Sequence, residues 1–345
     1  MCGMVLSHPI MPRSSALLRR PAAESARIIG RKYLNKLMQC REALGSGDDV
    51  AALHEFRVAL RRLRGVLRAF RSELEPQLSP TTRRELRRLA DATGECRNLQ
   101  LQQAWVVEAI RELARNEKTG ARWELGSIED RRSAAFARMH DRLMTWCAVE
   151  VPVLRRLFGS RKGTGINKRP RSTRAVVNRA GRQLADDLTQ HLSLVHSVRD
   201  QAEAHAARIA AKRARYLLQP FANGLRGASA AMERLRQLQD DLGVLHDAQT
   251  MAGEVRDAFG RMGAGRALAR ADALLPWAGG TPSRASRAVA TRLQPGLEAL
   301  ARRIRAETEA AFVRVEREWL GGAATELISR LRRGADGRTN RGGRI

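Results

Sequence analysis

Residues 54–64 read HEFRVALRRLR, and a weaker copy, HAARIAAKRAR, occupies residues 205–215. On a helical wheel at roughly 100° per residue, Phe56, Leu60, Leu63 and their apolar neighbours fall within an arc of about 120°. The second copy keeps this arc, with alanine in place of most of the larger side chains. The periodicity predicts an amphipathic α-helix in each copy, with one face buried in a core.

The two copies belong to a longer internal repeat with an offset of 151 residues, which is 205 minus 54. Other matches at this offset are Gly30-Arg31 with Gly181-Arg182, Leu37 with Leu188, Leu67 with Leu218 and Phe70 with Phe221. Residues 89–94 match residues 238–243 at an offset of 149. A repeat of this length indicates a fold assembled from similar units. We therefore predict an all-α protein whose tandem repeat forms two pseudo-symmetric four-helix bundles.

A basic stripe runs along each predicted helix, beside its apolar face. The first stripe, within an arc of about 80°, comprises His54, Arg57, Arg61, Arg64 and Arg68. The second comprises His205, Arg208, Lys212 and Arg215, with Gln219 in the place of Arg68. Like charges four residues apart destabilise a helix by ~0.2–0.5 kcal/mol. The stripes therefore indicate a bound anion, and the alternative is a solvated helix face with histidines that cap or pack.

The composition also indicates an anionic partner. The 345-residue chain carries a formal net charge of +27, and 57 of its 63 basic residues are arginine. Arginine matches phosphate oxygens with a bidentate fork, although a GC-rich genome would produce the same bias. On charge alone, nucleic acid, an anionic membrane and polyphosphate are all suitable partners. Aromatic residues make up only 4% of the chain and none lies in a stripe, so stacking on nucleic-acid bases has little support.

Turn-forming residues divide the chain into segments. Predicted helices cover 23–45, 50–74, 80–117, 127–158, 174–198, 201–223, 227–262 and 284–332, with a short helix inside 265–280. Asp48 and Asp49 are expected to cap the second helix, Ser79 and Pro80 to begin the third, Gly94 to interrupt it and Pro152 to bend the fourth. The predicted organisation is a flexible N-terminus (1–22), a first bundle (23–158), a basic linker (159–173), a second bundle (174–333) and a disordered basic tail (334–345).

The sequence lacks the motifs of common enzyme classes. It contains no GxxxxGK[ST], HExxH or GxSxG motif and no carboxylate cluster suited to magnesium-dependent phosphoryl transfer. A metal site is not expected, because the arginines beside His54 and His205 repel cations. We predict a non-enzymatic protein without cofactors. The remaining alternative is phosphoryl transfer through His54 or His205, for which no accompanying base is apparent.

Cysteine usage and hydropathy suggest a cytoplasmic protein. Cys2, Cys40, Cys96 and Cys147 are far apart and form no CxxC motif, which is typical of thiols in a reducing compartment. No apolar run approaches the ~18 residues that a membrane-spanning helix needs. Residues 1–12 do not resemble a signal peptide, because two prolines interrupt them and the charges follow the apolar part.

The two stretches resemble the hallmark of the CHAD family, the conserved histidine α-helical domain, whose pattern is similar to HxxRVxxRRxR in the first half. The family's glycine-centred segment resembles residues 94–98 and 243–247. Asn98 and Gln100 depart from it, since relatives often have acidic residues there. The resemblance covers roughly residues 23–333. It implies two pseudo-symmetric bundles around a basic cavity that binds inorganic polyphosphate, and association with polyphosphate granules. Some relatives carry a triphosphate tunnel domain, for which this chain has no room.

These observations define a set of candidate polyphosphate-binding residues. The set is His54, Arg57, Arg61, Arg62, Arg64, His205, Arg208, Lys212, Arg213 and Arg215, with Arg31 and Arg182 added from the preceding helices. Arginines on the following helices, Arg83, Arg84, Arg87 and Arg88 with Arg234 and Arg236 as their counterparts, are weaker candidates for the same basic wall. The alternative partner is nucleic acid bound without sequence preference, which the basic tail also suits.

Overall fold

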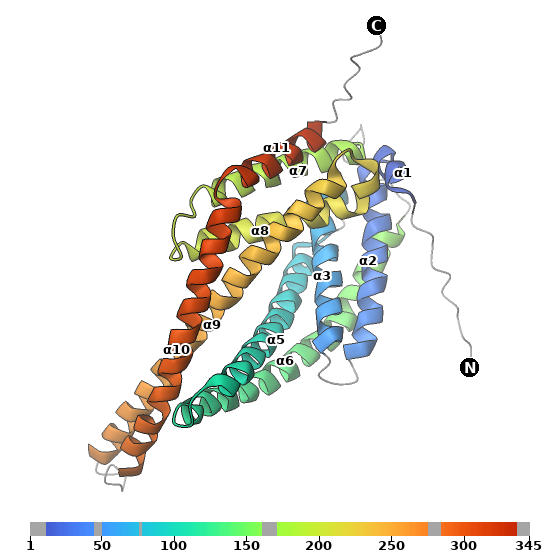
Figure 1. Cartoon of the computed structure of the whole chain (residues 1–345). Helices are drawn as coiled ribbons and strands as arrows, with labels where there is room; N and C mark the ends of the chain where they lie inside the picture. The colour runs from blue at the N-terminus through green and yellow to red at the C-terminus, as the bar shows by residue number, and fades with distance from the viewer. Residues whose placement is uncertain (1–11, 45–49, 76–77, 161–170, 275–283, 337–345) are drawn as a thin grey trace.

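The computed structural model describes residues 12–44, 50–75, 78–160, 171–274 and 284–336, and the side chains of 265–274, 284–290 and 333–336 are not described. Within these ranges the chain forms α-helices and one 3-10 helix (Figure 1). The extended backbone there is limited to one isolated bridge between Pro21 and Ser172. The all-α prediction is therefore confirmed.

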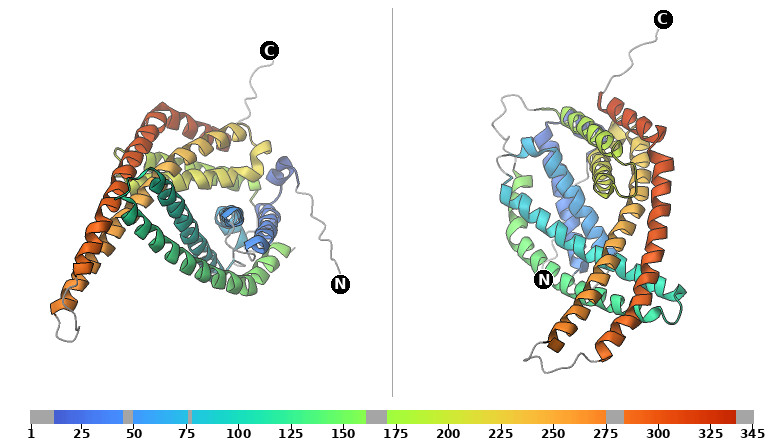
Figure 2. Two further views of the ribbon diagram at one scale, coloured as in Figure 1. Left: turned by 60° about the horizontal axis from the view of Figure 1, so that its bottom comes forward. Right: turned by 90° about the vertical axis from the view of Figure 1, so that its left-hand side faces the viewer.

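The helices of the first half are α1 (Ser14–Arg19), α2 (Ala22–Leu44), α3 (Val50–Ala69), α4 (Arg71–Leu74), α5 (Pro80–Glu112) and α6 (Lys118–Gly159). Those of the second half are α7 (Thr173–Leu192), α8 (Gln201–Leu218), the 3-10 helix η1 (Gln219–Gly224), α9 (Ala228–Leu274), α10 (Arg284–Trp319) and α11 (Gly322–Asp336). The helices α5 with α6, and α9 with α10, form two long antiparallel pairs (Figures 1 and 2). The shorter pairs α2 with α3, and α7 with α8, lie at one end of the molecule.

Serine caps begin two of these helices. The Ser79 hydroxyl accepts a hydrogen bond from the backbone N–H of Thr82 at 3.0 Å, and Pro80 follows at the first helical position, as predicted. The Ser172 hydroxyl accepts from the N–H of Ala175 at 3.2 Å at the start of α7. The expected caps Asp48 and Asp49 lie outside the described residues.

Several predicted boundaries were wrong. The third helix ends at Glu112 instead of 117, and the fourth begins at Lys118 instead of 127. The segment 284–332 is two helices, because α10 ends at Trp319 ahead of Gly321-Gly322. No separate helix begins inside 265–280 as far as the chain is described, since α9 continues to Leu274 alongside α10.

Neither predicted interruption occurs. Gly94 lies within α5, and Pro152 lies within α6. Proline in a helix removes one backbone hydrogen bond, but Leu154 and Phe158 beyond it are buried, and their packing offsets the loss. The predicted helix 174–198 ends earlier, at Leu192, because the Asp200 carboxylate accepts the backbone N–H groups of His196 and Ser197 and organises a turn ahead of α8.

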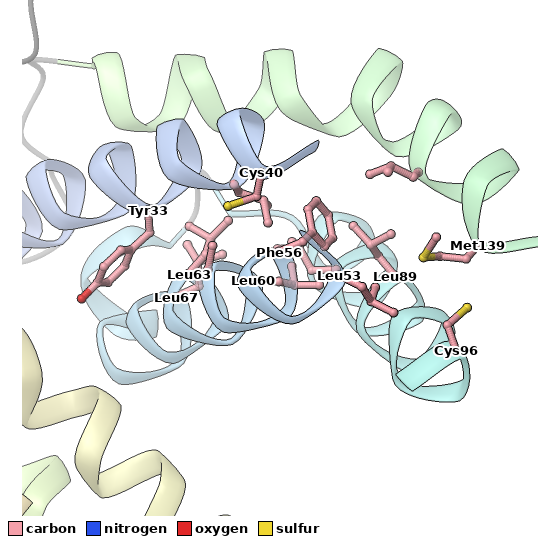
Figure 3. Close-up of a cluster of buried hydrophobic side chains, with 14 of the residues drawn as sticks. Tyr33, Cys40, Leu53, Phe56, Leu60, Leu63, Leu67, Leu89, Cys96 and Met139 are labelled. Carbon is pink, nitrogen blue, oxygen red and sulfur yellow. The ribbon is translucent and has the colours of Figure 1, made fainter. Parts of the chain in front are cut away.

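The apolar face of α3 forms the centre of the larger hydrophobic core. Phe56, Leu60 and Leu63 are at most 1% exposed and pack among side chains from α2, α5 and α6 (Figure 3). A second cluster, rich in alanine, joins α7 and α8 to α11 and parts of α9 and α10. The wheel assignment of the buried face is therefore confirmed in both copies.

Residues related by the repeat offset touch one another. Ala22 N–H donates to the carbonyl of Arg171, and Thr173 N–H donates to the carbonyl of Arg20, so the same bond is made twice at an offset of 151. The rings of Phe70 and Phe221 lie 6.4 Å apart between centroids. A Cβ atom at Gly65 would lie 3.6 Å from Cβ of Tyr216. Each contact joins a residue to its own counterpart.

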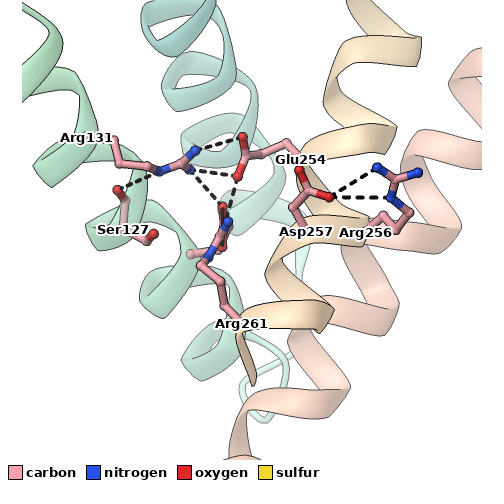
Figure 4. Close-up of polar contacts among 7 residues, drawn as sticks. Ser127, Arg131, Glu254, Arg256, Asp257 and Arg261 are labelled. Atoms are coloured by element: carbon pink, nitrogen blue, oxygen red, sulfur yellow. Dashed lines mark hydrogen bonds and ion pairs between the residues drawn. The ribbon is translucent and has the colours of Figure 1, made fainter. Parts of the chain in front are cut away.

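The two long helix pairs meet at a close backbone crossing and at a buried ionic cluster. A Cβ atom at Gly120 in α6 would lie 2.0 Å from the carbonyl oxygen of Leu293 in α10, so only glycine permits this approach. Nearby, Arg131 of α6 donates to both carboxylate oxygens of Glu254 of α9, at 2.7 and 3.0 Å (Figure 4). Arg261 of α9 reaches Glu124 of α6 at 2.6 Å. These contacts hold α6 against α9 and α10.

Candidate functional site

The basic stripes of α3 and α8 converge. Burial lowers the pKa of Lys212 to about 7, and the charges of Arg208 and Arg61 lower it further. Burial also lowers the pKa of Arg57 to about 9, with added repulsion from Arg61, Arg97 and Arg208. Cations from both copies therefore lie within electrostatic reach of one another. We call Arg57, Arg61, Arg208 and Lys212 the central cluster.

The central cluster is electrostatically unfavourable in the free protein. Desolvation and like charge both disfavour the charged forms, and they are the principal causes of the lowered pKa values. Asp247 offers partial compensation, with its carboxylate 3.8 Å from Arg208. The side chain of Arg208 is only 15% exposed, and its buried Nε has no hydrogen-bond partner. An anion bound here would supply both the missing charge and the missing acceptor.

Glycines make room for the first arginine of each stripe. Arg57 donates from Nη1 to the carbonyl of Thr93 in α5, and a Cβ atom on the next residue, Gly94, would lie 3.4 Å from that nitrogen. In the second half, a Cβ atom at Gly243 would lie 3.9 Å from Nε of Arg208. Gly94, expected to interrupt its helix, therefore provides space for a guanidinium group instead.

A second group of cations extends the central cluster. Burial lowers the pKa of Arg68 to about 10, with repulsion from Arg213 and Arg64. Burial also lowers the pKa of Arg64, on which Arg87, Arg213 and Arg61 act as further positive charges and Asp91 as a negative one. Arg213 of α8 thus lies opposite the end of the first stripe, although it is not part of the second.

Two histidines pair at the start of the second stripe. Nδ1 of His205 lies 3.2 Å from Nδ1 of His246 in α9, and the ring centroids are 4.5 Å apart. Burial lowers the pKa of His246 to about 3, helped by the charges of Arg208 and His205. A hydrogen bond between two Nδ1 atoms requires that one ring be donor and the other acceptor. Sequence reasoning missed His246, although it occupies the position of Arg97 at the offset of 149.

Other candidate residues lie apart from this convergence. Arg31 and Arg182 are exposed on α2 and α7, and His54 is exposed at the start of its stripe. The charge of Arg62 acts on Tyr33 of α2, and the guanidinium of Arg215 lies over the ring of Tyr216, 5.3 Å from its centroid. Their contribution to anion binding remains a prediction.

Most arginines of the weaker set are engaged elsewhere. Arg83 pairs with Glu75 at 2.8 Å, and Arg88 with Glu85 at 2.6 Å. Arg236 pairs with both Glu233 and Asp240, while Arg234 lies over the ring of Trp319. Of this set, only Arg87 acts on the stripe, through Arg64. A helical wheel cannot identify such pairs, because most of the acidic partners lie on the same helix within one turn.

Within the described part of the chain, no three His, Cys, Asp or Glu side chains are grouped so that they could hold a metal ion. None of the described helices is long and apolar enough to span a membrane. Cys40, Cys96 and Cys147 are free thiols.

Comparisons with known proteins match this architecture. The family described as the CHAD domain matches residues 28–256. The crystal structure of the CHAD domain from the plant Ricinus communis is similar with a TM-score of 0.55 and 21% identity, covering 89% of this chain and 97% of that one. PptA from Streptomyces chartreusis aligns with a TM-score of 0.49 and 14% identity, covering 85% of this chain and 100% of that one. No curated protein sequence matches the chain.

Proposed function

The chain belongs to the CHAD domain family, and from this premise we propose that it binds inorganic polyphosphate without chemically changing it. The observation that carries the proposal is the central cluster, in which Arg57 and Arg61 of one repeat converge with Arg208 and Lys212 of the other. Consecutive stripe residues lie one helical turn apart, about 5.4 Å along the axis. A linear anion with a charge on every unit suits such rows better than a single compact anion.

We also propose that the two repeats form tandem four-helix bundles around a shared basic cavity. Support comes from helix starts that recur at one spacing: α7 begins 151 residues after α2 (173 minus 22), and α8 begins 151 residues after α3 (201 minus 50). The contacts of Phe70 with Phe221 and of Gly65 with Tyr216 fit a pseudo-two-fold axis between α3 and α8. Such an axis explains why the two stripes face the same space.

The proposal that the protein is not an enzyme rests on the sequence, which offers no recognised catalytic motif beside the stripes. It is tested by incubating the protein with polyphosphate and measuring released phosphate and chain length. The proposal further implies a cytoplasmic protein that co-localises with polyphosphate granules, which imaging of a fluorescently tagged chain would test.

Charge reversal at counterpart positions tests the binding site. The variant Arg61→Glu/Lys212→Glu is compared with Arg122→Glu/Arg199→Glu, whose arginines are exposed on α6 and ahead of α8. Both variants lower the net charge by four units. If the central cluster is the site, the first variant loses about a hundredfold or more in affinity, because two charged contacts of ~1.5–3 kcal/mol each are removed. Equal losses would leave only a general polycation.

Competition distinguishes polyphosphate from nucleic acid. The basic segments outside the stripes make RNA the rival ligand, since its backbone carries the same phosphate charges. Labelled polyphosphate bound to the protein is challenged with RNA at equal phosphate concentration, and the reverse experiment follows. Displacement of RNA by polyphosphate, without the converse, supports the proposal, whereas the opposite result favours the rival.

A further inference from the structure

A separate pocket of about 460 Å³ lies between α5, α9 and α10. Its walls are mainly apolar and include Leu101 and Trp105 of α5 with Val244 and Met251 of α9. Val244 is 48% exposed, which is unusual for a large apolar side chain. The volume falls within the ~300–1,000 Å³ of small-molecule sites, and apolar walls with a few polar groups are typical of them.

One polar group in this wall lacks a partner. Gln102 is 9% exposed and lines the pocket, and its Oε1 is buried without a hydrogen-bond donor. A buried acceptor left unsatisfied costs about 1–3 kcal/mol, so a donor from a bound molecule would be stabilising. The pocket's carboxylates are already engaged, because Glu307 accepts from Nε1 of Trp105 at 2.6 Å and from Nε of Arg303 at 2.9 Å. The unmet requirement is therefore a neutral N–H or O–H donor on an apolar body.

The pocket adjoins the central cluster. Asp247 lines the pocket and also lies 3.8 Å from Arg208. Asn98, at the same end, follows Arg97, whose charge acts on Arg57. One molecule can therefore place an organic head in the pocket and extend an anionic chain onto the arginines.

We propose that this pocket binds the base of a nucleoside polyphosphate whose phosphate chain lies on the central cluster. A nucleobase is a flat, largely apolar ring that carries exocyclic N–H donors for Gln102, and the phosphates supply the charge. The inference rests on the proposed polyphosphate-binding function and adds to it a class of smaller, headed ligands.

The test compares ATP with inorganic tripolyphosphate. Esterification leaves ATP with one ionisable oxygen fewer, so charge alone favours tripolyphosphate. The expected result is that ATP binds the parent protein about tenfold more tightly, equivalent to ~1.4 kcal/mol from the base. Isothermal titration without divalent cations measures both ligands, and long-chain polyphosphate is titrated alongside them.

Two pocket variants locate the effect. Ala310→Trp fills the pocket from an exposed position, and Ala306→Trp, one turn away on α10 and outside the pocket, is its control. Gln102→Met removes the acceptor while keeping the side-chain length. Ala310→Trp should abolish the preference for ATP and leave tripolyphosphate binding unchanged. Gln102→Met should weaken only ATP, by about two- to tenfold, the factor of one net hydrogen bond of ~0.5–1.5 kcal/mol.

The outcomes separate the two proposals. If tripolyphosphate binds at least as tightly as ATP while long-chain polyphosphate binds well, the pocket proposal is wrong and the proposed function stands. If Ala310→Trp weakens both ligands equally, or Ala306→Trp acts in the same way, the pocket proposal is also wrong. If no phosphate ligand binds, the proposed function itself fails.

Discussion

At the scale of single residues, the sequence predicted charges well and their partners poorly. The stripes gave Arg57, Arg61, Arg208 and Lys212 correctly as neighbours on their own helices. Their convergence across the two halves depends on tertiary packing, which a wheel does not include. The His205–His246 pair was missed for the same reason, although applying the repeat offset to Arg97 would have pointed to His246.

Gly94 provides a direct test of how the stripe is positioned. Gly94→Leu should displace the Arg57 guanidinium, because even a Cβ atom there lies 3.4 Å from Nη1. We expect polyphosphate affinity to fall about ten- to hundredfold, the loss of one charged contact of ~1.5–3 kcal/mol. Gly126→Leu in α6 is the matched control, since a Cβ atom there meets nothing within 4 Å. Titration of both variants decides, and an unchanged affinity in Gly94→Leu would show that Arg57 does not need this space.

Lys212 should make polyphosphate binding depend on pH. Its pKa in the folded protein is lowered to about 7, from 10.5 for an ordinary lysine, by burial and by Arg208 and Arg61. A bound anion favours the protonated form, so affinity should decrease as pH rises from 6 to 9, with proton uptake on binding. His246, whose pKa is lowered to about 3, does not titrate in this window. Calorimetry in buffers of different ionisation enthalpy measures the uptake.

The same shift has a defined effect on stability. Between about pH 7 and 10.5 the unfolded chain binds more protons at position 212 than the folded protein does, so the free energy of unfolding rises with pH there. Lys212→Met should remove this contribution, and Lys212→Arg should flatten the pH dependence of binding because arginine stays charged. A Lys212→Arg variant with the parent's pH profile would assign the dependence to another group.

At the scale of helices, existence and type were predictable but ends were not. Apolar periodicity identified every long helix, because burial of one face dominates their energetics. The ends at Glu112 and Leu192, and the division of α10 from α11, depend on turns and neighbouring helices. Pro152 and Gly94, which favour interruption locally, are overruled by packing on both sides.

The contact between Phe70 and Phe221 tests whether α3 and α8 are energetically coupled. Each ring is 1% exposed, so each Phe→Ala substitution should destabilise the protein by ~3–5 kcal/mol. The double variant should be less destabilised than the sum by ~0.5–1.5 kcal/mol, the value of an aromatic pair. Phe70→Ala combined with Trp319→Ala, in the other cluster, should be additive. Urea unfolding provides the values, and additivity in both pairs would mean that the 6.4 Å contact carries no coupling.

At the scale of the whole molecule, a net charge of +27 opposes folding, and much of the opposition is concentrated where α3 meets α8. The buried Arg131–Glu254 and Arg261–Glu124 pairs show that this chain neutralises buried arginine where only structure is required. The central cluster has only Asp247 within ion-pair range, at 3.8 Å. That contrast between two buried groups of arginines is the strongest whole-molecule argument for an external anion.

Salt should therefore act in opposite directions on the free protein and on its complex. The screening length falls from ~10 Å at 0.1 M to ~3 Å at 1 M salt, so sodium chloride relieves self-repulsion and should raise the melting temperature of the free protein. Polyphosphate at one hundred times its dissociation constant adds ~2.7 kcal/mol at low salt, but its affinity falls steeply as counterions compete. Melting curves recorded by circular dichroism from 0.05 to 1 M sodium chloride should rise without polyphosphate and converge with those recorded at a fixed polyphosphate concentration. A polyphosphate-induced shift that stays constant across this range would mean that contacts other than ionic ones hold the ligand, and the role assigned to the stripes would then be wrong.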